Sequence, residues 1–239
     1  MTTVIQEPEP GLAGAEFFSL LKEPLRVLLV RHGESEGNAR QIVQGRLDLP
    51  LNARGRSQAA ALAPWIAAQG PEAILASPLL RAAETAHILF GGCEPRPRIR
   101  PEALLAELDA GPFTGLSLDE AALRHPEAHA SFLRKSWDGV PGAEASVELY
   151  ARALRVWELL REEGIGGARV VVAVTHGGFL QWLIKATLGS KSWFPLFPMS
   201  NCGLSELVAM PQPGGGVLLT WKRIDWQAPG VAAAVQPLF

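Results

Sequence analysis

Short apolar runs alternate along the chain with longer segments whose apolar residues recur at helical spacing. Three of these runs are apolar except for one residue, Arg26, which is typical of strands buried on both faces of a sheet. They cover residues 25–30, 73–76 and 170–174, and two later strands are predicted at 204–209 and 217–224. Helices are predicted at residues 53–68, 78–90, 144–163 and 179–188. Ser77 is the expected N-cap of the second helix, with Pro78 at its first position.

Strands that alternate with helices in this way predict a three-layer α/β/α fold with a central, mostly parallel sheet and right-handed crossovers. The main domain covers residues 25–228 and contains a small helical cap at about 111–142, where periodicity is weak and glycine, proline and serine are frequent. Residues 1–24 form an N-terminal extension with one short helical turn near 15–21, and residues 229–239 form a C-terminal tail.

The composition suits one α/β domain, since the chain has 239 residues, 48% of them hydrophobic and 19% charged. A net charge of −2 gives no general attraction to nucleic acid or to an anionic membrane. The two cysteines, Cys93 and Cys202, lie far apart, which suits a reducing compartment. The chain has no secretory leader and no apolar stretch of spanning length, so we expect a cytoplasmic protein without nucleic-acid or membrane partners.

Polar clusters follow three of the predicted strands. Arg31-His32-Gly33-Glu34 comes directly after the first strand, Arg81 lies in the first turn of the helix after the second, and His176-Gly177-Gly178 follows the valine-rich strand. In an open α/β sheet, ligands bind beyond the carboxyl ends of the strands. The sequence therefore predicts one pocket that holds two arginines and two histidines.

A pocket of this composition suits a phosphoryl group. Arginine presents planar donors that match phosphate oxygens, and a Gly-Gly pair at a helix start exposes backbone N–H groups to an anion. At ~4 Å and an effective dielectric constant of about 20, each cation–anion pair contributes roughly 4 kcal/mol before desolvation is subtracted. Two arginines and one charged histidine would then hold the group without a metal or cofactor. His125 and His129 are spaced like helical metal ligands but have no third ligand at a useful spacing, so a solvated helix face is expected there.

Several motifs occur in an order and spacing that resembles the histidine phosphatase superfamily, which has the phosphoglycerate mutase-like fold. The matching segments are Val30-Arg31-His32-Gly33-Glu34-Ser35 with Asn38, Gln44-Gly45, Asp48-Leu49-Pro50-Leu51, Gly55-x-x-Gln58-Ala59, Ser77-Pro78-x-x-Arg81, Leu105-x-Glu107 and Thr175-His176-Gly177-Gly178. The resemblance extends over residues 26–208.

The resemblance implies a role for each matching residue. His32 would be the nucleophile that forms a phosphohistidine, and Glu107 would be the general acid. Arg31, Arg81 and His176 would bind the phosphoryl oxygens. Further phosphate or substrate contacts would come from Asn38, Gln44, Gly45 and the Gly177 backbone. Glu34 either supports the loop by hydrogen bonds, the reading that we favour, or takes part in the chemistry.

The residues around Glu107 favour the phosphatase branch of this family. Cofactor-dependent mutases resemble Leu-Asn-Glu-Arg-x-Tyr-Gly here, whereas this chain has Leu108 and Ala110 in place of the arginine and tyrosine. The branch often continues with an aromatic residue, glutamate and glycine, but Thr114 stands at the glutamate position. We therefore predict hydrolysis of a small phosphomonoester. Mutase-type phosphotransfer and a catalytically weak module that binds phosphorylated partners are the alternatives.

Two groups of aromatic residues have more than one interpretation. Phe113, Phe132 and Trp137 either pack the cap onto the domain, which we favour, or face an apolar part of the substrate. The segment 193–198 forms either a homodimer contact or the rim of the pocket.

Overall fold

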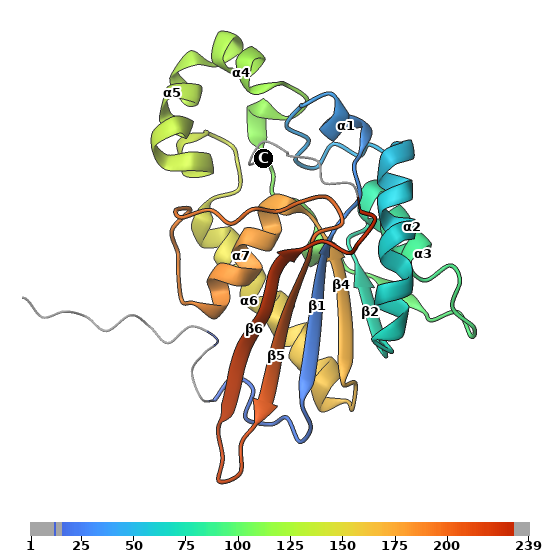
Figure 1. The fold of residues 1–239 in the computed structure, drawn as a ribbon. Coiled ribbons are helices and arrows are strands. Elements are labelled where there is room, and N and C mark those ends of the chain that lie inside the picture. The colour runs from blue at the N-terminus through green and yellow to red at the C-terminus, as the bar shows by residue number, and fades with distance from the viewer. Residues whose placement is uncertain (1–11, 13–15, 232–239) are drawn as a thin grey trace, which may run out of the picture.

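A six-stranded mixed sheet, in the order β3-β2-β4-β1-β5-β6, forms the middle layer of the molecule (Figure 1). The computed structural model describes Leu12 and residues 16–231. The strands are β1 (Leu25–Arg31), β2 (Ala73–Ala76), β3 (Ile99–Pro101), β4 (Val170–Thr175), β5 (Leu204–Pro211) and β6 (Val217–Trp226). The first four are parallel to one another, and β5 and β6 add an antiparallel hairpin beside β1. The predicted, mostly parallel sheet is confirmed.

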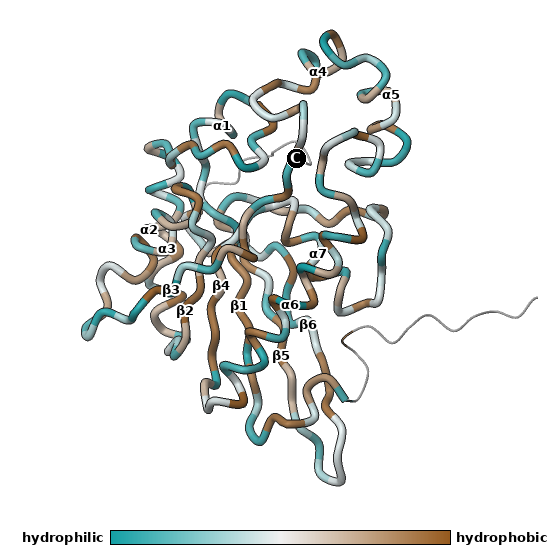
Figure 2. Tube along the Cα trace, turned by 180° about the vertical axis from the view of Figure 1, so that it is seen from behind, coloured by the Kyte–Doolittle hydropathy of each residue, from teal (hydrophilic) through white to brown (hydrophobic). Residues whose placement is uncertain are grey.

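Helices cover both faces of the sheet. They are α1 (Glu36–Ala39), α2 (Ala53–Ala68), α3 (Leu80–Leu89), α4 (Leu118–Arg124), α5 (Pro126–Lys135), α6 (Ser146–Ile165) and α7 (Gly177–Thr187), with short 3₁₀ turns at Ala103–Leu105, Gly111–Phe113 and Ser136–Gly139. Alternate residues of β1 point to opposite faces, so Leu28 and Val30 pack in the apolar core beneath α2 and α3. Val27 and Leu29 pack in the second core, beneath α6 and α7. Apolar strands run through the middle of the chain trace in Figure 2, as the three-layer prediction requires.

The predicted start of the helix after β2 is wrong. Ser77 still belongs to the sheet edge, because its N–H donates to Val174 O at 2.9 Å. Helix α3 begins at Leu80, with Leu79 as its N-cap. The short strand β3 was not predicted, since it lies in a connector that is interrupted by prolines. Helix α6 begins and ends two residues later than predicted, and α7 begins two residues and ends one residue earlier than predicted.

Part of the predicted N-terminal extension lies against the core. Residues 16–20 form turns rather than the expected helical turn, and residues 1–11 and 13–15 lie outside the described residues. Phe18 is buried, and its ring meets that of Trp157 edge-on at a centroid distance of 6.3 Å. Of the predicted tail, only residues 229–231 are described, and Val231 packs into the core on the α2 and α3 side. Among the described residues, no helix is long and apolar enough to cross a membrane.

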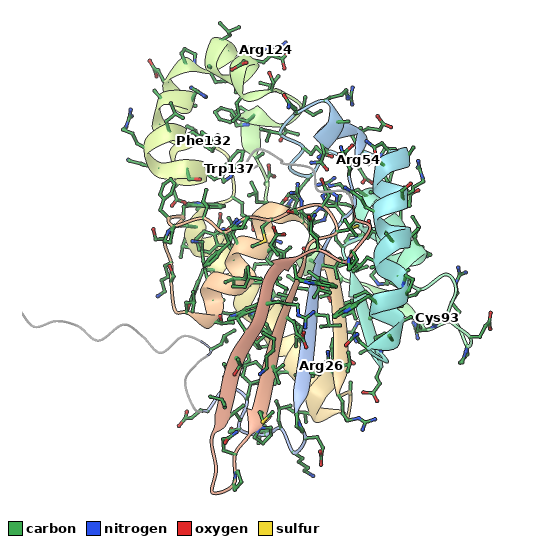
Figure 3. The ribbon with its side chains drawn as sticks, viewed as in Figure 1. Arg26, Arg54, Cys93, Arg124, Phe132 and Trp137 are labelled. Carbon is green, nitrogen blue, oxygen red and sulfur yellow. The ribbon has the colours of Figure 1, made fainter. Side chains whose placement is uncertain are left out.

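Helices α4 and α5 form a cap that lies beyond the carboxyl ends of the parallel strands (Figure 1). Its aromatic rings pack on one another, with Phe132 5.0 Å from Trp137 and 5.8 Å from Phe113 between ring centroids, and all three are buried. Figure 3 shows Phe132 and Trp137 close together at the base of the cap. The three rings belong to the same apolar core as Trp157 on α6, so the interpretation that they pack the cap onto the domain is confirmed. His125 and His129 are half-buried beside the same rings, so the expected solvated helix face is wrong.

Candidate active site

The register of the sheet brings the two predicted histidines together. Arg31 on β1 pairs with Thr175 on β4, and each strand ends there. His32 and His176 are the next residues, and the His32 N–H donates to Thr175 O at 3.0 Å. Their ring centroids are 5.1 Å apart. The two imidazoles therefore share one site, at the edge of the sheet where the sequence predicts it.

His32 has one ring nitrogen fixed by the backbone and the other turned toward an arginine. Its Nδ1 lies 2.6 Å from Gly33 O, which accepts the Nδ1 proton, and its Nε2 accepts from Arg81 Nε at 3.2 Å. Burial, followed by the charges of Arg81 and Arg31, lowers the pKa of His32 well below the ordinary histidine value. The ring is therefore neutral at neutral pH, and its Nε2 carries the lone pair that a nucleophile requires.

Arg81 is held in a fixed orientation by the loop after α1. Its Nη1 donates to Leu47 O at 2.9 Å and its Nη2 donates to Gly45 O at 2.8 Å. Burial lowers the pKa of Arg81 to about 10, so the guanidinium stays charged at neutral pH. Gly45 has a φ of +48°, a left-handed conformation that favours glycine. The predicted residue Gly45 thus acts here through its backbone, by orienting Arg81.

Two buried nitrogens of the site have no hydrogen-bond partner among the described residues: Arg31 Nε and His176 Nδ1. Arg31 is otherwise anchored, since its Nη1 donates to Met199 O, and His176 Nε2 lies 2.7 Å from Ser77 Oγ. Buried polar atoms are nearly always paired in folded proteins. These two nitrogens therefore indicate that the site takes an additional group with acceptor oxygens, such as an oxyanion.

The positive charge of the site comes from the arginines. Burial, and next the charge of Arg81, lowers the pKa of His176 well below its ordinary value. The expectation of one charged histidine is therefore wrong for the protein without a bound anion. Burying a charged imidazole beside two guanidinium groups costs too much free energy.

Glu107 lies at the start of helix α7, close to the arginines. Its carboxylate oxygens accept from the N–H groups of Leu108 (3.0 Å), Gly178 (3.1 Å) and Phe179 (2.8 Å). A Cβ on Gly178 would lie 2.7 Å from Glu107 Oε1, so this approach requires glycine. The negative charge of Glu107 raises the pKa of Arg31 and that of Arg81, against the larger effect of burial. The predicted acid is therefore in the same site.

The remaining predicted residues lie in the loop after β1 or at the start of α7, and two of them use their side chains within the loop. Asn38 Oδ1 accepts from the Ser35 N–H at 3.1 Å, and Gln44 Oε1 accepts from Ser35 Oγ at 2.8 Å. Gly177 is the first residue of α7, and a Cβ there would lie 3.1 Å from Arg31 Cζ. These contacts put Asn38 and Gln44 in the framework of the loop and Gly177 against the guanidinium group of Arg31.

Glu34 has the contacts of a loop support. Its Oε1 accepts from Asn52 Nδ2 at 2.7 Å, and its Oε2 lies 3.5 Å from Arg54 Nη1. Figure 3 shows Arg54 on helix α2, beside this loop. Glu34 therefore ties the loop after β1 to the start of α2.

Sequence reasoning missed two residues that touch the histidines. The sequence predicts Ser77 as a helix cap, but its place directly after β2 puts it on the same sheet edge as His176. Asn201 Nδ2 donates to His32 O at 3.0 Å. Asn201 precedes β5, and nothing in its local sequence shows that β5 pairs antiparallel with β1.

Two histidines, two arginines and a carboxylate lie together at one end of an α/β sheet, an arrangement that suits an oxyanion next to an imidazole. Residues 27–223 match the histidine phosphatase superfamily (branch 1). The chain belongs to this superfamily.

Its relatives include phosphatases. A glucosyl-3-phosphoglycerate phosphatase of Mycolicibacterium vanbaalenii is 32% identical over 214 residues, which are 85% of this chain and 94% of that protein. A 2-carboxy-D-arabinitol-1-phosphatase of Triticum aestivum is 34% identical over 199 residues, or 82% of this chain but 39% of the wheat protein. The solved structure of a mycobacterial glucosyl-3-phosphoglycerate phosphatase matches with a TM-score of 0.72 and 29% identity, over 84% of this chain and 99% of that chain.

Proposed function

We propose that this protein hydrolyses small phosphomonoesters through a phosphohistidine on His32, without a metal or cofactor. The observation that carries the proposal is the geometry of the His32 ring, whose Nδ1 lies 2.6 Å from Gly33 O, whose Nε2 lies 3.2 Å from Arg81 Nε and whose neighbour is His176. Membership of the superfamily and the phosphatases among the relatives support a phosphomonoester hydrolase.

In the first half-reaction, the substrate phosphoryl group is bound by Arg31 and Arg81. The buried nitrogens Arg31 Nε and His176 Nδ1 supply donors for its oxygens. Arg81 Nε then donates its hydrogen bond to a phosphoryl oxygen instead of to His32 Nε2, which frees the lone pair of Nε2. His32 Nε2 attacks phosphorus and the bond from phosphorus to the ester oxygen breaks. Glu107 receives the proton of the monoanionic phosphoryl group and passes it to the departing alcohol.

In the second half-reaction, water replaces the alcohol. Glu107, now a carboxylate, takes a proton from the water as its oxygen attacks the phosphorus of phospho-His32. The N–P bond breaks and its electron pair returns to Nε2, so the products are inorganic phosphate and the free enzyme. Arg31 and Arg81 offset the charge that develops on the phosphoryl oxygens in both steps.

We also propose the setting in which the reaction takes place. The two cysteines are free, Cys93 half-buried and Cys202 buried, which supports a cytoplasmic protein. The net charge of −2 supports a small phosphorylated substrate rather than nucleic acid. Phe194 is 51% exposed within the segment 193–198, and this segment remains our candidate for a homodimer contact. The catalytic domain would be residues 25–228, with its cap at 111–142.

Product analysis tests hydrolysis against the alternatives. Leu108 and Ala110 are buried apolar residues, so the positions of the mutase arginine and tyrosine carry no group that would retain a bisphosphorylated intermediate. With p-nitrophenyl phosphate or 3-phosphoglycerate we expect free phosphate, and His32→Ala should release none from either. In Glu107→Gln, release from 3-phosphoglycerate should be strongly reduced, because its leaving group needs a proton. Formation of 2-phosphoglycerate without phosphate release would show a mutase. Binding of phosphorylated ligands without turnover would show a binding module.

A further inference from the structure

Side chains from two distant elements hold the short segment that leads to Glu107. Arg152 on helix α6 uses its Nη1 to donate to Leu104 O at 2.8 Å and to Ala106 O at 2.7 Å. Thr175 Oγ1 donates to the carbonyl between them, Leu105 O, at 2.6 Å. Three successive carbonyl groups before Glu107 are therefore fixed by side chains rather than by a regular helix or strand.

Arg152 also contacts the helix that receives the carboxylate. Its Cζ lies 3.8 Å from the ring centroid of Phe179, and the Phe179 N–H donates to Glu107 Oε1. One guanidinium group thus touches both the segment from which Glu107 extends and the residue that binds its carboxylate. A shift of Arg152 would therefore move the segment that carries Glu107 relative to the start of α7, which binds the Glu107 carboxylate.

Glu144 holds Arg152 in this position. The pair is bidentate, with Arg152 Nε 2.8 Å from Glu144 Oε1 and Arg152 Nη2 2.8 Å from Glu144 Oε2. Both side chains are about nine-tenths buried, since their exposed fractions are 11% and 10%. Glu144 also accepts from the Asp109 N–H at 3.2 Å and donates its own N–H to Asp109 O at 2.9 Å. The pair therefore contacts the chain on both sides of Glu107.

We infer that Arg152, together with Glu144, is a positioning residue that sets the place of the Glu107 carboxyl group for proton transfer to the leaving group. The inference rests on the proposed function, in which Glu107 is the acid. It does not require Arg152 to touch the substrate. The hydrogen bonds of Arg152 in the described part of the chain go to Glu144, Leu104 and Ala106, and its only effect on the predicted phosphate-binding residues is a minor lowering of the His176 pKa by its charge. Substrates whose leaving group needs a proton should therefore depend on Arg152 far more than the others.

The test compares two leaving groups in Arg152→Met. Glycerol 2-phosphate releases an alkoxide that needs a proton, whereas p-nitrophenyl phosphate releases a stable phenolate. Since positioned acids contribute about 100-fold or more, we expect kcat/KM for glycerol 2-phosphate to fall about 100-fold and that for p-nitrophenyl phosphate to fall less than about threefold. The inhibition constant of vanadate should change less than about threefold, since the oxyanion site is kept. Arg155→Met, at an exposed position one turn from Arg152 on α6, should leave all three values unchanged.

Glu107→Gln separates the inference from the proposed function, since it should give the same contrast between the two substrates. If Glu107→Gln shows the contrast and Arg152→Met lowers both substrates equally, the positioning role is refuted and the function stands. If Glu107→Gln shows no contrast, the acid role is refuted and the inference with it. Should Arg152→Met not fold, Arg152→Lys keeps a charge beside Glu144 but cannot bind both carbonyls and the carboxylate. It should still lose about tenfold on glycerol 2-phosphate alone, and an equal loss on both substrates would refute the inference.

Discussion

The catalytic loop is packed against the start of α2 with no space for an additional methyl group. A Cβ on Gly55 would lie 2.7 Å from the Glu34 N atom and closer still to the Glu34 carbonyl oxygen. The loop and the helix also approach closely at Gly33, where a Cβ would lie 2.9 Å from the Gly55 carbonyl carbon. Both partners are backbone, so neither can rotate away. The substitution Gly55→Ala should therefore push the loop that carries His32 away from helix α2.

The magnitude follows from two opposing effects. Alanine normally stabilises a helix interior by up to about 1 kcal/mol relative to glycine. Overpacking costs about 1–3 kcal/mol and occasionally more, and a clash between two backbone segments belongs at the upper end of this range. We expect a net loss of about 2–3 kcal/mol in the free energy of unfolding, which corresponds to a fall of about 5–10 °C in Tm for a chain of this size. Because the displaced loop holds the nucleophile, kcat/KM should fall about 100-fold.

Thermal unfolding and phosphatase assays of the purified variant measure both quantities. Gly92→Ala is the matched control, since a Cβ at Gly92 has nothing within 4 Å, and it should leave Tm and activity unchanged. A Gly55→Ala protein as stable and as active as the parent would refute the reasoning that this close contact positions the loop. A loss of stability without loss of activity would show that the loop keeps its shape when the helix moves.

Three further predictions concern individual side chains. Burial lowers the pKa of both His32 and His176, so below about pH 6.5 the unfolded chain binds protons that the folded chain does not. The free energy of unfolding should therefore reach its full value above about pH 6.5. Below that pH it should fall by up to about 1.4 kcal/mol per pH unit for each histidine. Urea unfolding between neutral pH and about pH 5.5 should give a shallower fall for His32→Asn, and parallel curves would contradict this. Ser77→Ala removes the hydroxyl beside His176 Nε2 and should lower kcat/KM about tenfold, the equivalent of one hydrogen bond, whereas unchanged kinetics would show that the contact does not orient the ring. Burial raises the pKa of Cys202 to about 12, so iodoacetamide should modify Cys93, on the loop labelled in Figure 3, and not Cys202 until the protein unfolds, as peptide mass spectrometry would show.

The sequence predicted the sheet and the central part of the site for a clear physical reason. His32 and His176 each lie just beyond a short, mostly apolar run, and apolar runs of that length are strands of a buried parallel sheet. Once β1 and β4 are neighbours, the register that pairs Arg31 with Thr175 must put His32 next to His176. Local pattern and global topology agree here, so the prediction needed no further information.

Contacts that depend on tertiary folding were out of reach. Ser77-Pro78 has the pattern of a helix start, but the Ser77 N–H still donates to Val174 O on β4, and α3 begins only at Leu80. Asn201 and Arg152 lie 169 and 45 positions away from the residues that they support, His32 and Glu107, and no local pattern links them. The cap aromatics were ambiguous for a similar reason, since buried and substrate-facing rings have the same spacing in the sequence.

Chemical trapping of the phosphoenzyme tests the central proposal most directly. The protein is mixed with p-nitrophenyl phosphate, quenched at alkaline pH and digested, and the peptides are examined by mass spectrometry. We expect one phosphoryl group on His32, lost on acid treatment and absent from His32→Ala. A phosphoryl group on another residue, or phosphate release by His32→Ala at the rate of the parent protein, would contradict the proposed mechanism.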